Sequence, residues 1–210
     1  MSGDILQSEP DAGPVGRDTK GTRTRERILE CAAIVLKERG YASTRLSDVA
    51  KIAAIRPTAL YYHFDSRETL IEEVVTLGQQ RVYDHVAQAL EAARGLDPIE
   101  RIRLAVRAHL EMTLRDSNHA SAAIRTLGQL PAEIREKQLV EQRRYGDLWR
   151  HLIADGVSSG QIGPGKSVSA MRMLALGALN WIPEWWNPQH GSLEDIIQTA
   201  EKFILDGLKA

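Results

Sequence analysis

Residues 44–67, with the sequence TRLSDVAKIAAIRPTALYYHFDSR, constrain the fold of this chain more than any other stretch. Apolar residues recur there at three- and four-residue spacing, which predicts two short amphipathic helices joined by a tight turn. We expect the first over about 45–53, with Thr44 as its N-cap, and the second from Pro57, since proline favours the first turn of a helix. Two short helices packed together are typical of a helix-turn-helix, whose second helix enters the major groove of DNA.

The second of these helices has an inner apolar side and an outer polar one. Leu60 and Phe64 lie four residues apart and point inward, so the neighbouring side chains fall on or beside the opposite face. Hydroxyl, imidazole and guanidinium groups can reach base edges and phosphates. We therefore expect DNA contacts from Thr44, Arg45, Ser47, Arg56, Thr58, Tyr61, Tyr62, His63 and Arg67. The alternative is that some of these residues only cover a helix surface, or that one of the two tyrosines packs inward.

Positive charge is concentrated around this segment. The 210 residues carry 27 Lys and Arg against 28 Asp and Glu, a net charge of −1, which neither favours nor excludes a nucleic-acid partner. Residues 17–67, however, contain eleven Lys and Arg but only six Asp and Glu. Such a local surplus favours attraction to a phosphate backbone.

Composition and periodicity predict an all-α protein. The chain is rich in Ala, Leu, Glu and Arg and poor in alternating β-branched runs. Glycine and proline separate the expected further helices, which run over about 24–39, 67–93, 98–115, 120–129, 131–159, 168–186 and 193–208. We divide the chain into a disordered tail (1–20), a three-helix helix-turn-helix domain for DNA binding (21–68) and a larger helical domain for ligand binding and dimerisation (69–210). Whether the tail touches DNA stays open.

The C-terminal helices carry two further signals. The apolar faces of residues 168–179 and 193–208 suit an interface between two copies, although ordinary core packing would give the same periodicity. Three of the four tryptophans fall within residues 181–186. Because an indole offers a broad apolar wall with one N–H donor, we expect a site for a hydrophobic small molecule. Its predicted lining is Trp149, Trp181 and Trp185, and the alternative is that these rings plug the end of a helix bundle.

No catalytic centre, cofactor or metal site is expected. The six histidines are scattered without HExxH spacing or a Cys–His pairing, and there is no phosphate-binding glycine loop or GxSxG. Cys31 is the only cysteine, which fits a reducing compartment. No apolar run approaches the ~18 residues needed to cross a membrane, and the N-terminus lacks a signal-peptide pattern. We therefore expect a cytoplasmic protein with no membrane partner.

Residues 24–75 resemble the tetracycline-repressor (TetR) family of regulators, through TRLSDVA and PTALYYHFDSRETLIEEV. The resemblance implies that the exposed residues of both short helices face DNA and that Arg67 contacts phosphate, where the family more often has Lys. Ala54 stands where the family usually has Gly, so the turn is expected to be mildly strained. Arg56 replaces the common small N-cap. Because both changes lie in the turn that aims the second helix, the operator sequence cannot be inferred.

The resemblance also implies an assembly and a class of effector. TetR-like proteins dimerise through their last two long helices as a four-helix bundle, which implies a homodimer on a palindromic operator. The C-terminal end is similar to regulators of fatty-acid and sterol catabolism, which respond to acyl-CoA thioesters. We therefore expect a ligand-responsive transcriptional regulator, a repressor released by a hydrophobic small molecule, with acyl-CoA as one candidate. The alternative class is a helical small-molecule-binding protein or enzyme with a vestigial helix-turn-helix.

Overall fold

The computed structural model describes residues 20–163, 165 and 167–209, and no strand occurs among them. Its helices are α1 (Lys20–Ser43), α2 (Leu46–Ile52), α3 (Pro57–Tyr61), α4 (Arg67–Ala92), α5 (Pro98–Glu111), α6 (Asn118–Thr126), α7 (Ala132–Ser158), α8 (Val168–Trp185) and α9 (Leu193–Lys209). A π-helical turn, η1 (Met112–Asp116), precedes α6, and a 3-10 turn, η2 (Leu127–Gln129), follows it. The all-α prediction is confirmed. The predicted tail lies outside the described residues, apart from Lys20, where α1 begins.

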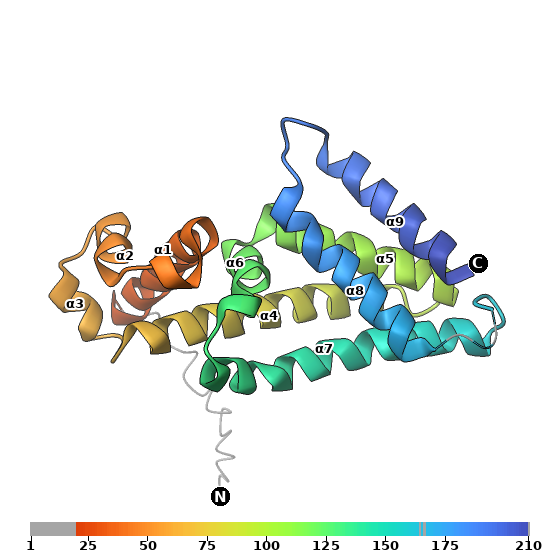
Figure 1. The fold of residues 1–210 in the computed structure, drawn as a ribbon, viewed down its shortest axis with the longest axis horizontal. Helices are drawn as coiled ribbons and strands as arrows, with labels where there is room; N and C mark the ends of the chain where they lie inside the picture. Colours follow the sequence, from red (N-terminus) through yellow and green to blue (C-terminus); the bar gives the residue numbers. More distant parts are fainter. Residues whose placement is uncertain (1–19, 164, 166, 210) are drawn as a thin grey trace, which may run out of the picture.

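Helices α1, α2 and α3 gather at one end of the molecule, where they pack against the first half of α4 (Figure 1). Their core is closed around Leu36, Leu60 and Phe64, which are at most 2% exposed. Ala122 and Ala123 of α6 also belong to this core. The N-terminal helices are therefore packed onto the rest of the chain. The domain boundary at residue 68 stays a prediction, because α4 continues from one core into the other.

The connections that lead into α2 and α4 are fixed by local conformation and hydrogen bonds. Gly40 has a φ of +72°, a left-handed conformation that glycine tolerates, and α1 bends there and continues to Ser43. Ser66 caps α4, since its Oγ accepts a hydrogen bond from the backbone N–H of Thr69 at 3.0 Å. The prediction of Thr44 as the N-cap of α2 is wrong. Arg45 occupies that position, and its guanidinium has no acceptor with which to cap the helix. The Thr44 hydroxyl instead donates to the Gly40 carbonyl at 2.7 Å.

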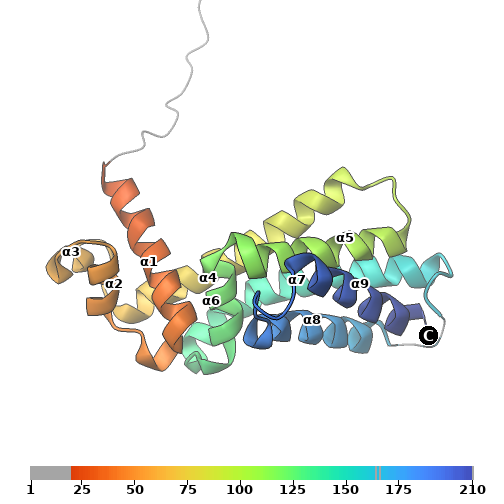
Figure 2. The same ribbon diagram turned by 90° about the horizontal axis from the view of Figure 1, so that it is seen from above.

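The C-terminal helices surround a second core. Trp149 of α7, Ile102 of α5 and Leu179 of α8 are fully buried in it. Helix α9 lies along α5, and α8 and α9 are on the same side of this body (Figure 2). Arg107 of α5 holds α9 in place, because its guanidinium pairs with Glu194 at 2.8 Å and with Glu201 at 3.0 Å. Among the described residues, no helix has both the length and the apolar character that a membrane crossing requires.

Helix α6 lies between the two cores, against both α1 and α4 (Figure 1). Gly78 of α4 allows this close approach, because a Cβ there would overlap the backbone carbonyl of His119. Asn118 adds a polar link to α1, since its Nδ2 donates to Glu30 Oε1 at 2.9 Å and its Oδ1 accepts from Lys37 Nζ at 3.3 Å. Any movement of α6 would therefore act on α1 and α4 together.

Candidate nucleic-acid interface and internal cavity

The outer sides of α2 and α3 expose polar and aromatic groups. Tyr62 is 86% exposed and Tyr61 58%, so neither tyrosine packs inward, whereas Leu60 is completely buried. His63 is half-buried and meets the Tyr62 ring edge-to-face, with a centroid separation of 5.2 Å. The predicted residues that the structure places at exposed or half-exposed positions here are Arg45, Ser47, Arg56, Thr58, Tyr61, Tyr62 and His63. Their contact with DNA stays a prediction.

Two of the predicted DNA-contacting residues are engaged inside the domain. Thr44 is 2% exposed, and its hydroxyl is taken up by Gly40. Arg67 donates from Nε to the Thr44 carbonyl at 2.7 Å and from Nη2 to the Tyr41 carbonyl, and its guanidinium lies 4.4 Å above the Tyr41 ring. These bonds fix the start of α4 to the α1–α2 connection. The side chains of Thr44 and Arg67 thus have partners inside the domain, and their contact with DNA stays a prediction.

The turn between α2 and α3 has the strained residue that the sequence predicted. Ala54 has a φ of +51°, and no other non-glycine residue among those described has a positive φ. A left-handed conformation costs an L-residue with a Cβ about 1–2 kcal/mol. The turn is closed by hydrogen bonds from Ala54 N to the Lys51 carbonyl at 3.2 Å and from Ile55 N to the Ala50 carbonyl at 3.0 Å. Arg56 then stands at the N-cap of α3 without a side-chain cap.

A cavity of about 130 Å³, partly open to solvent, lies inside the C-terminal body between α4, α5, α6, α7 and α8. Part of its wall is apolar, formed by Val82, Ala120, Ala123, Ile124 and Leu127. The rest is polar, formed by Gln79, His109, Glu141, Gln142, Tyr145 and Asn180. Helix α6 contributes three of the apolar side chains, so the helix that touches α1 also forms a wall of the cavity.

His109 and Tyr145 form a buried pair at this cavity. His109 Nδ1 and the Tyr145 hydroxyl are 2.8 Å apart, and their rings stack with centroids separated by 5.9 Å. Burial lowers the pKa of His109 to about 4 and raises the pKa of Tyr145, so both groups are neutral near pH 7. Sequence reasoning missed this polar lining. The only local signal was that His109 falls in the apolar stripe of α5, next to Ala105 and Val106.

The three tryptophans predicted to line a ligand site do not surround one cavity. Trp149 is fully buried in the C-terminal core, where its ring meets Tyr145 edge-to-face. Trp181 and Trp185 are 64% and 54% exposed and line a hollow of about 260 Å³ between α8 and α9, together with Phe203. Their role in ligand binding stays a prediction.

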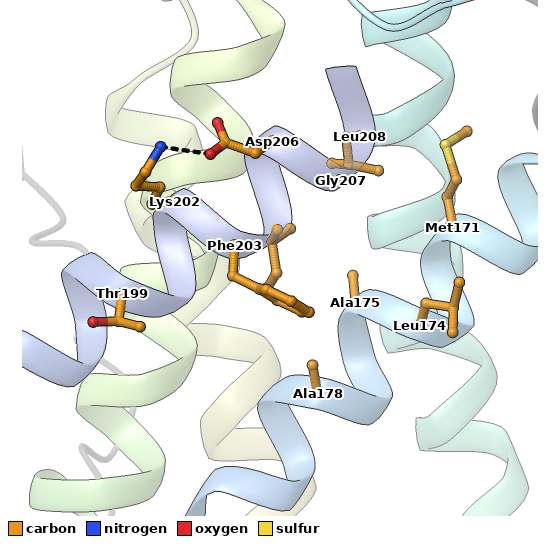
Figure 3. Close-up of a pocket in the computed structure, with 11 residues that line it drawn as sticks. Met171, Leu174, Ala175, Ala178, Thr199, Lys202, Phe203, Asp206, Gly207 and Leu208 are labelled. Atoms are coloured by element: carbon orange, nitrogen blue, oxygen red, sulfur yellow. Dashed lines mark hydrogen bonds and ion pairs between the residues drawn. The ribbon is translucent and has the colours of Figure 1, made fainter. Parts of the chain in front are cut away.

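An apolar groove of about 930 Å³ runs between α8 and α9 (Figure 3). Leu174 of α8 and Phe203 of α9 line it and are 74% and 70% exposed. Lys202 and Asp206, 2.6 Å apart, form a polar pair at the groove. Exposed apolar surface of this extent usually marks an interaction site.

The described residues hold no other reactive cluster. No group of three or more His, Cys, Asp or Glu side chains among them could hold a metal ion. Cys31 is a buried free thiol whose pKa is raised by burial. A buried thiol with a raised pKa is a poor nucleophile, because the thiolate is the reactive form.

Both parts of the chain match known protein families. Residues 28–74 match the bacterial regulatory proteins of the tetR family, and residues 95–208 match the tetracyclin repressor-like C-terminal domain. The chain belongs to the TetR family. The predicted family is confirmed, and the exposed surface of α2 and α3 is that of a helix-turn-helix transcription regulator.

Relatives of this TetR-family protein match it over most of their length. The HTH-type transcriptional repressor KstR2 of Rhodococcus jostii (strain RHA1) is 28% identical over 202 residues, covering 93% of this chain and 96% of KstR2. The crystal structure of the TetR-family regulator PfmR from Thermus thermophilus is 28% identical, with a TM-score of 0.74, and covers 88% of this chain and 100% of PfmR. AibR, crystallised with isovaleryl coenzyme A and operator DNA, shares the fold at 22% identity and a TM-score of 0.78, over 86% of this chain and 97% of AibR.

Proposed function

We propose that this protein is a transcriptional repressor that binds palindromic operator DNA as a homodimer and is released by a small molecule in the internal cavity. Family membership and the repressor KstR2 among its relatives support this proposal. An acyl-CoA thioester is a candidate effector, because AibR has the same fold and was crystallised with isovaleryl coenzyme A and operator DNA.

The groove between α8 and α9 supports the homodimer. Large apolar side chains such as Leu174 and Phe203 are exposed there, and their burial against a second copy would be favourable. TetR-family regulators bind operator DNA as dimers. A two-fold axis through this groove would present two copies of α3 to two half-sites about one DNA turn apart.

The position of α6 is the observation that carries the proposal. This helix walls the cavity and packs on α1 and α4, with no room for a Cβ between Gly78 and the His119 carbonyl. The turn after α6 also contacts the DNA-binding end of the molecule, formed by α1, α2 and α3, because Gln129 Oε1 accepts a hydrogen bond from Tyr41 N at 2.9 Å. A ligand that displaces α6 would therefore change the orientation of α2 and α3. Coupling of this kind amounts to typically 1–3 kcal/mol.

DNA binding is tested by selecting duplexes from a random pool with the purified protein. We expect binding that weakens steeply with salt, and at least a tenfold loss in Tyr62→Ala or His63→Ala at unchanged thermal stability. Leu96→Ala is the matched control, because Leu96 is an exposed apolar residue between α4 and α5, far along the chain from the DNA-binding helices. Failure to enrich any duplex, or equal binding by all variants, would contradict the proposal.

Coupling through α6 is tested with Gly78→Ala on the selected operator. The added methyl group should push α6 from α4 and weaken operator binding without any ligand, by roughly fivefold or more. Gly95→Ala serves as the control, because nothing lies within 4 Å of a Cβ at Gly95. In parallel, isovaleryl coenzyme A is titrated into the wild-type complex. Unchanged operator affinity in folded Gly78→Ala would show that α6 does not connect the cavity to the DNA-binding helices.

A further inference from the structure

The internal cavity contains buried polar atoms that lack partners. Among the residues that the structure describes, Gln79 Oε1, His109 Nε2, Glu141 Oε2 and Gln142 Nε2 have no hydrogen-bond partner, and all four residues line this cavity. The Arg144 guanidinium is 3.8 Å from Glu141 Oε2, beyond hydrogen-bond distance. Buried polar atoms in native proteins are almost always satisfied by protein, water or ligand. Four such atoms in residues that line one cavity therefore require hydrogen-bond partners there, which water or a polar ligand can supply.

The size of the cavity limits that guest to a small group. Its volume is about 130 Å³. For comparison, a dry engineered cavity of about 150 Å³ binds benzene, which has six non-hydrogen atoms. The cavity as it stands accommodates a group of roughly that size. If the effector is a large thioester, only its acyl end would fit here.

The charge of the lining disfavours an anionic guest. Glu141, whose Oε2 is 3.8 Å from the Arg144 guanidinium, contributes a carboxylate to the lining, and His109 supplies no positive charge near pH 7, because burial lowers its pKa to about 4. A carboxylate or phosphate entering the cavity would lose its hydration and face Glu141. A hydroxyl group, by contrast, would donate a hydrogen bond to Glu141 Oε2. An ionised carboxylate only accepts hydrogen bonds, so this atom requires a donor.

We propose that the cavity recognises a small neutral group that carries at least one hydroxyl and one carbonyl oxygen on an apolar frame. Glu141 accepts the hydrogen bond of the hydroxyl, and the Gln142 amide donates to the carbonyl. Val82, Ala123 and Ile124 contact the apolar frame. This inference rests on the proposed function only in taking the cavity as the effector site. It predicts an effector whose buried part carries oxygen atoms, where the sequence alone predicted a hydrophobic molecule.

Three probes of equal size separate the possible guests. Racemic 3-hydroxy-2-butanone has the hydroxyl and the carbonyl, 3-methyl-2-butanone has a methyl in place of the hydroxyl, and lactate has a carboxylate in place of the acetyl group. Each has six non-hydrogen atoms. Binding to the full-length protein is followed by NMR of ¹³C-methyl-labelled alanines, with Ala120 and Ala123, which line the cavity, as reporters.

We expect the hydroxyketone to shift the Ala120 and Ala123 signals with at least tenfold higher affinity than the methyl ketone or lactate, because a buried acceptor rejects an analogue that lacks the donor. In Glu141→Met the preference for the hydroxyl should fall below threefold, while the exposed Glu136→Met on the same helix keeps it. If Glu141→Met does not fold, Gln142→Met should reduce the affinity for both ketones. Equal affinity for the two ketones, preference for lactate, or no shift with any probe would overturn the proposal.

Operator binding is measured separately on the same samples. A hydroxyketone that binds the cavity but leaves the operator affinity unchanged would contradict the proposed effector role and leave the inferred ligand chemistry standing. Release of the operator by a ligand that does not shift Ala120 and Ala123 would instead support the repressor and overturn this cavity as its site. The two proposals can thus fail independently.

Discussion

The N-terminal helices expose the polar side chains of their candidate site to solvent, whereas the C-terminal helices bury theirs around a cavity. In the N-terminal helices the core is closed around Leu60 and Phe64, and the hydroxyl of Tyr62 lies outside, on a residue that is 86% exposed. In the C-terminal helices His109 is 1% exposed and lines a cavity, while large apolar side chains such as Phe203 are at the surface. Exposed side chains can be changed without disturbing the core, whereas substitution of a buried residue that lines the cavity is expected to affect stability as well.

The largest expected effect is the difference in stability between a variant of the C-terminal core and a variant of the DNA-facing surface. Trp149→Ala should lower the free energy of unfolding by about 3–5 kcal/mol, because it removes a fully buried indole from the C-terminal core. Tyr62→Ala should leave that free energy within about 0.5 kcal/mol of wild type, since the side chain lies in solvent. Urea unfolding followed by circular dichroism measures both. Similar losses in the two variants would remove the distinction between the two halves.

The second prediction concerns pH and the buried histidine. Burial holds the pKa of His109 at about 4 in the folded protein, below its usual value of 6.5, so the unfolded chain takes up the proton first. Stability should therefore be complete above pH 6.5 and fall as the pH drops from 6.5 towards 4, by up to about 3 kcal/mol from this residue. His119 contributes in the same direction, because burial and Arg81 lower its pKa to about 4, against the opposing effect of Glu30.

Unfolding of His109→Gln across this pH range isolates the contribution of His109. The variant should lose part of the acid destabilisation and keep the part due to His119. A variant with the same pH dependence as the wild type would show that His109 is not held neutral by burial, and would weaken the contrast between the buried polar groups of this half and the exposed ones of the other.

A third prediction compares two arginines of the DNA-binding end. Arg67→Ala should destabilise the fold by about 2 kcal/mol, because it leaves the carbonyls of Tyr41 and Thr44 without their charged donor. Arg45 is exposed, and Arg45→Ala should instead reduce the slope of log affinity against log salt by about 1, with stability unchanged. Salt titrations of operator binding and thermal unfolding distinguish them. A reduced salt slope in Arg67→Ala would show that Arg67 also contacts phosphate.

The sequence predicted much more of the DNA-binding end than of the cavity. The reason is how far apart in the sequence the residues of each site lie. Tyr61, Tyr62 and His63 are adjacent in the sequence, and helical periodicity placed them on or beside the outer face, leaving open only whether one tyrosine packs inward. Glu141 and His109 meet across one cavity only after five helices have packed, and each resembles an ordinary core or surface residue in its own helix. Trp149, Trp181 and Trp185 illustrate the same limit, since periodicity and composition grouped rings that the fold separates.

The internal hydrogen bonds of Thr44 and Arg67 have a related cause. Exposure of Thr44 and Arg67 was inferred from their places in the motif, yet both are used to connect α1, α2 and α4. Residues at the ends of helices have backbone carbonyls nearby that need donors, and a side chain that satisfies them is withdrawn from solvent. Helix periodicity does not describe these positions. It therefore assigns faces well within α2 and α3 and less well where the helices begin.

The smallest expected effect tests whether the turn before α3 is only strained or also serves binding. Ala54→Gly should stabilise the fold by about 0.5–1 kcal/mol, because relief of the left-handed conformation exceeds the entropy that glycine adds to the unfolded chain. Ala59→Gly within α3 is the matched control and should destabilise by a similar amount, since Ala59 is helical. Because glycine adopts the same φ, the orientation of α3 and the operator affinity should stay as in the wild type. A stabilised variant with weaker operator binding would mean that the Cβ of Ala54 helps to aim α3, so that stability and binding would be linked at this turn.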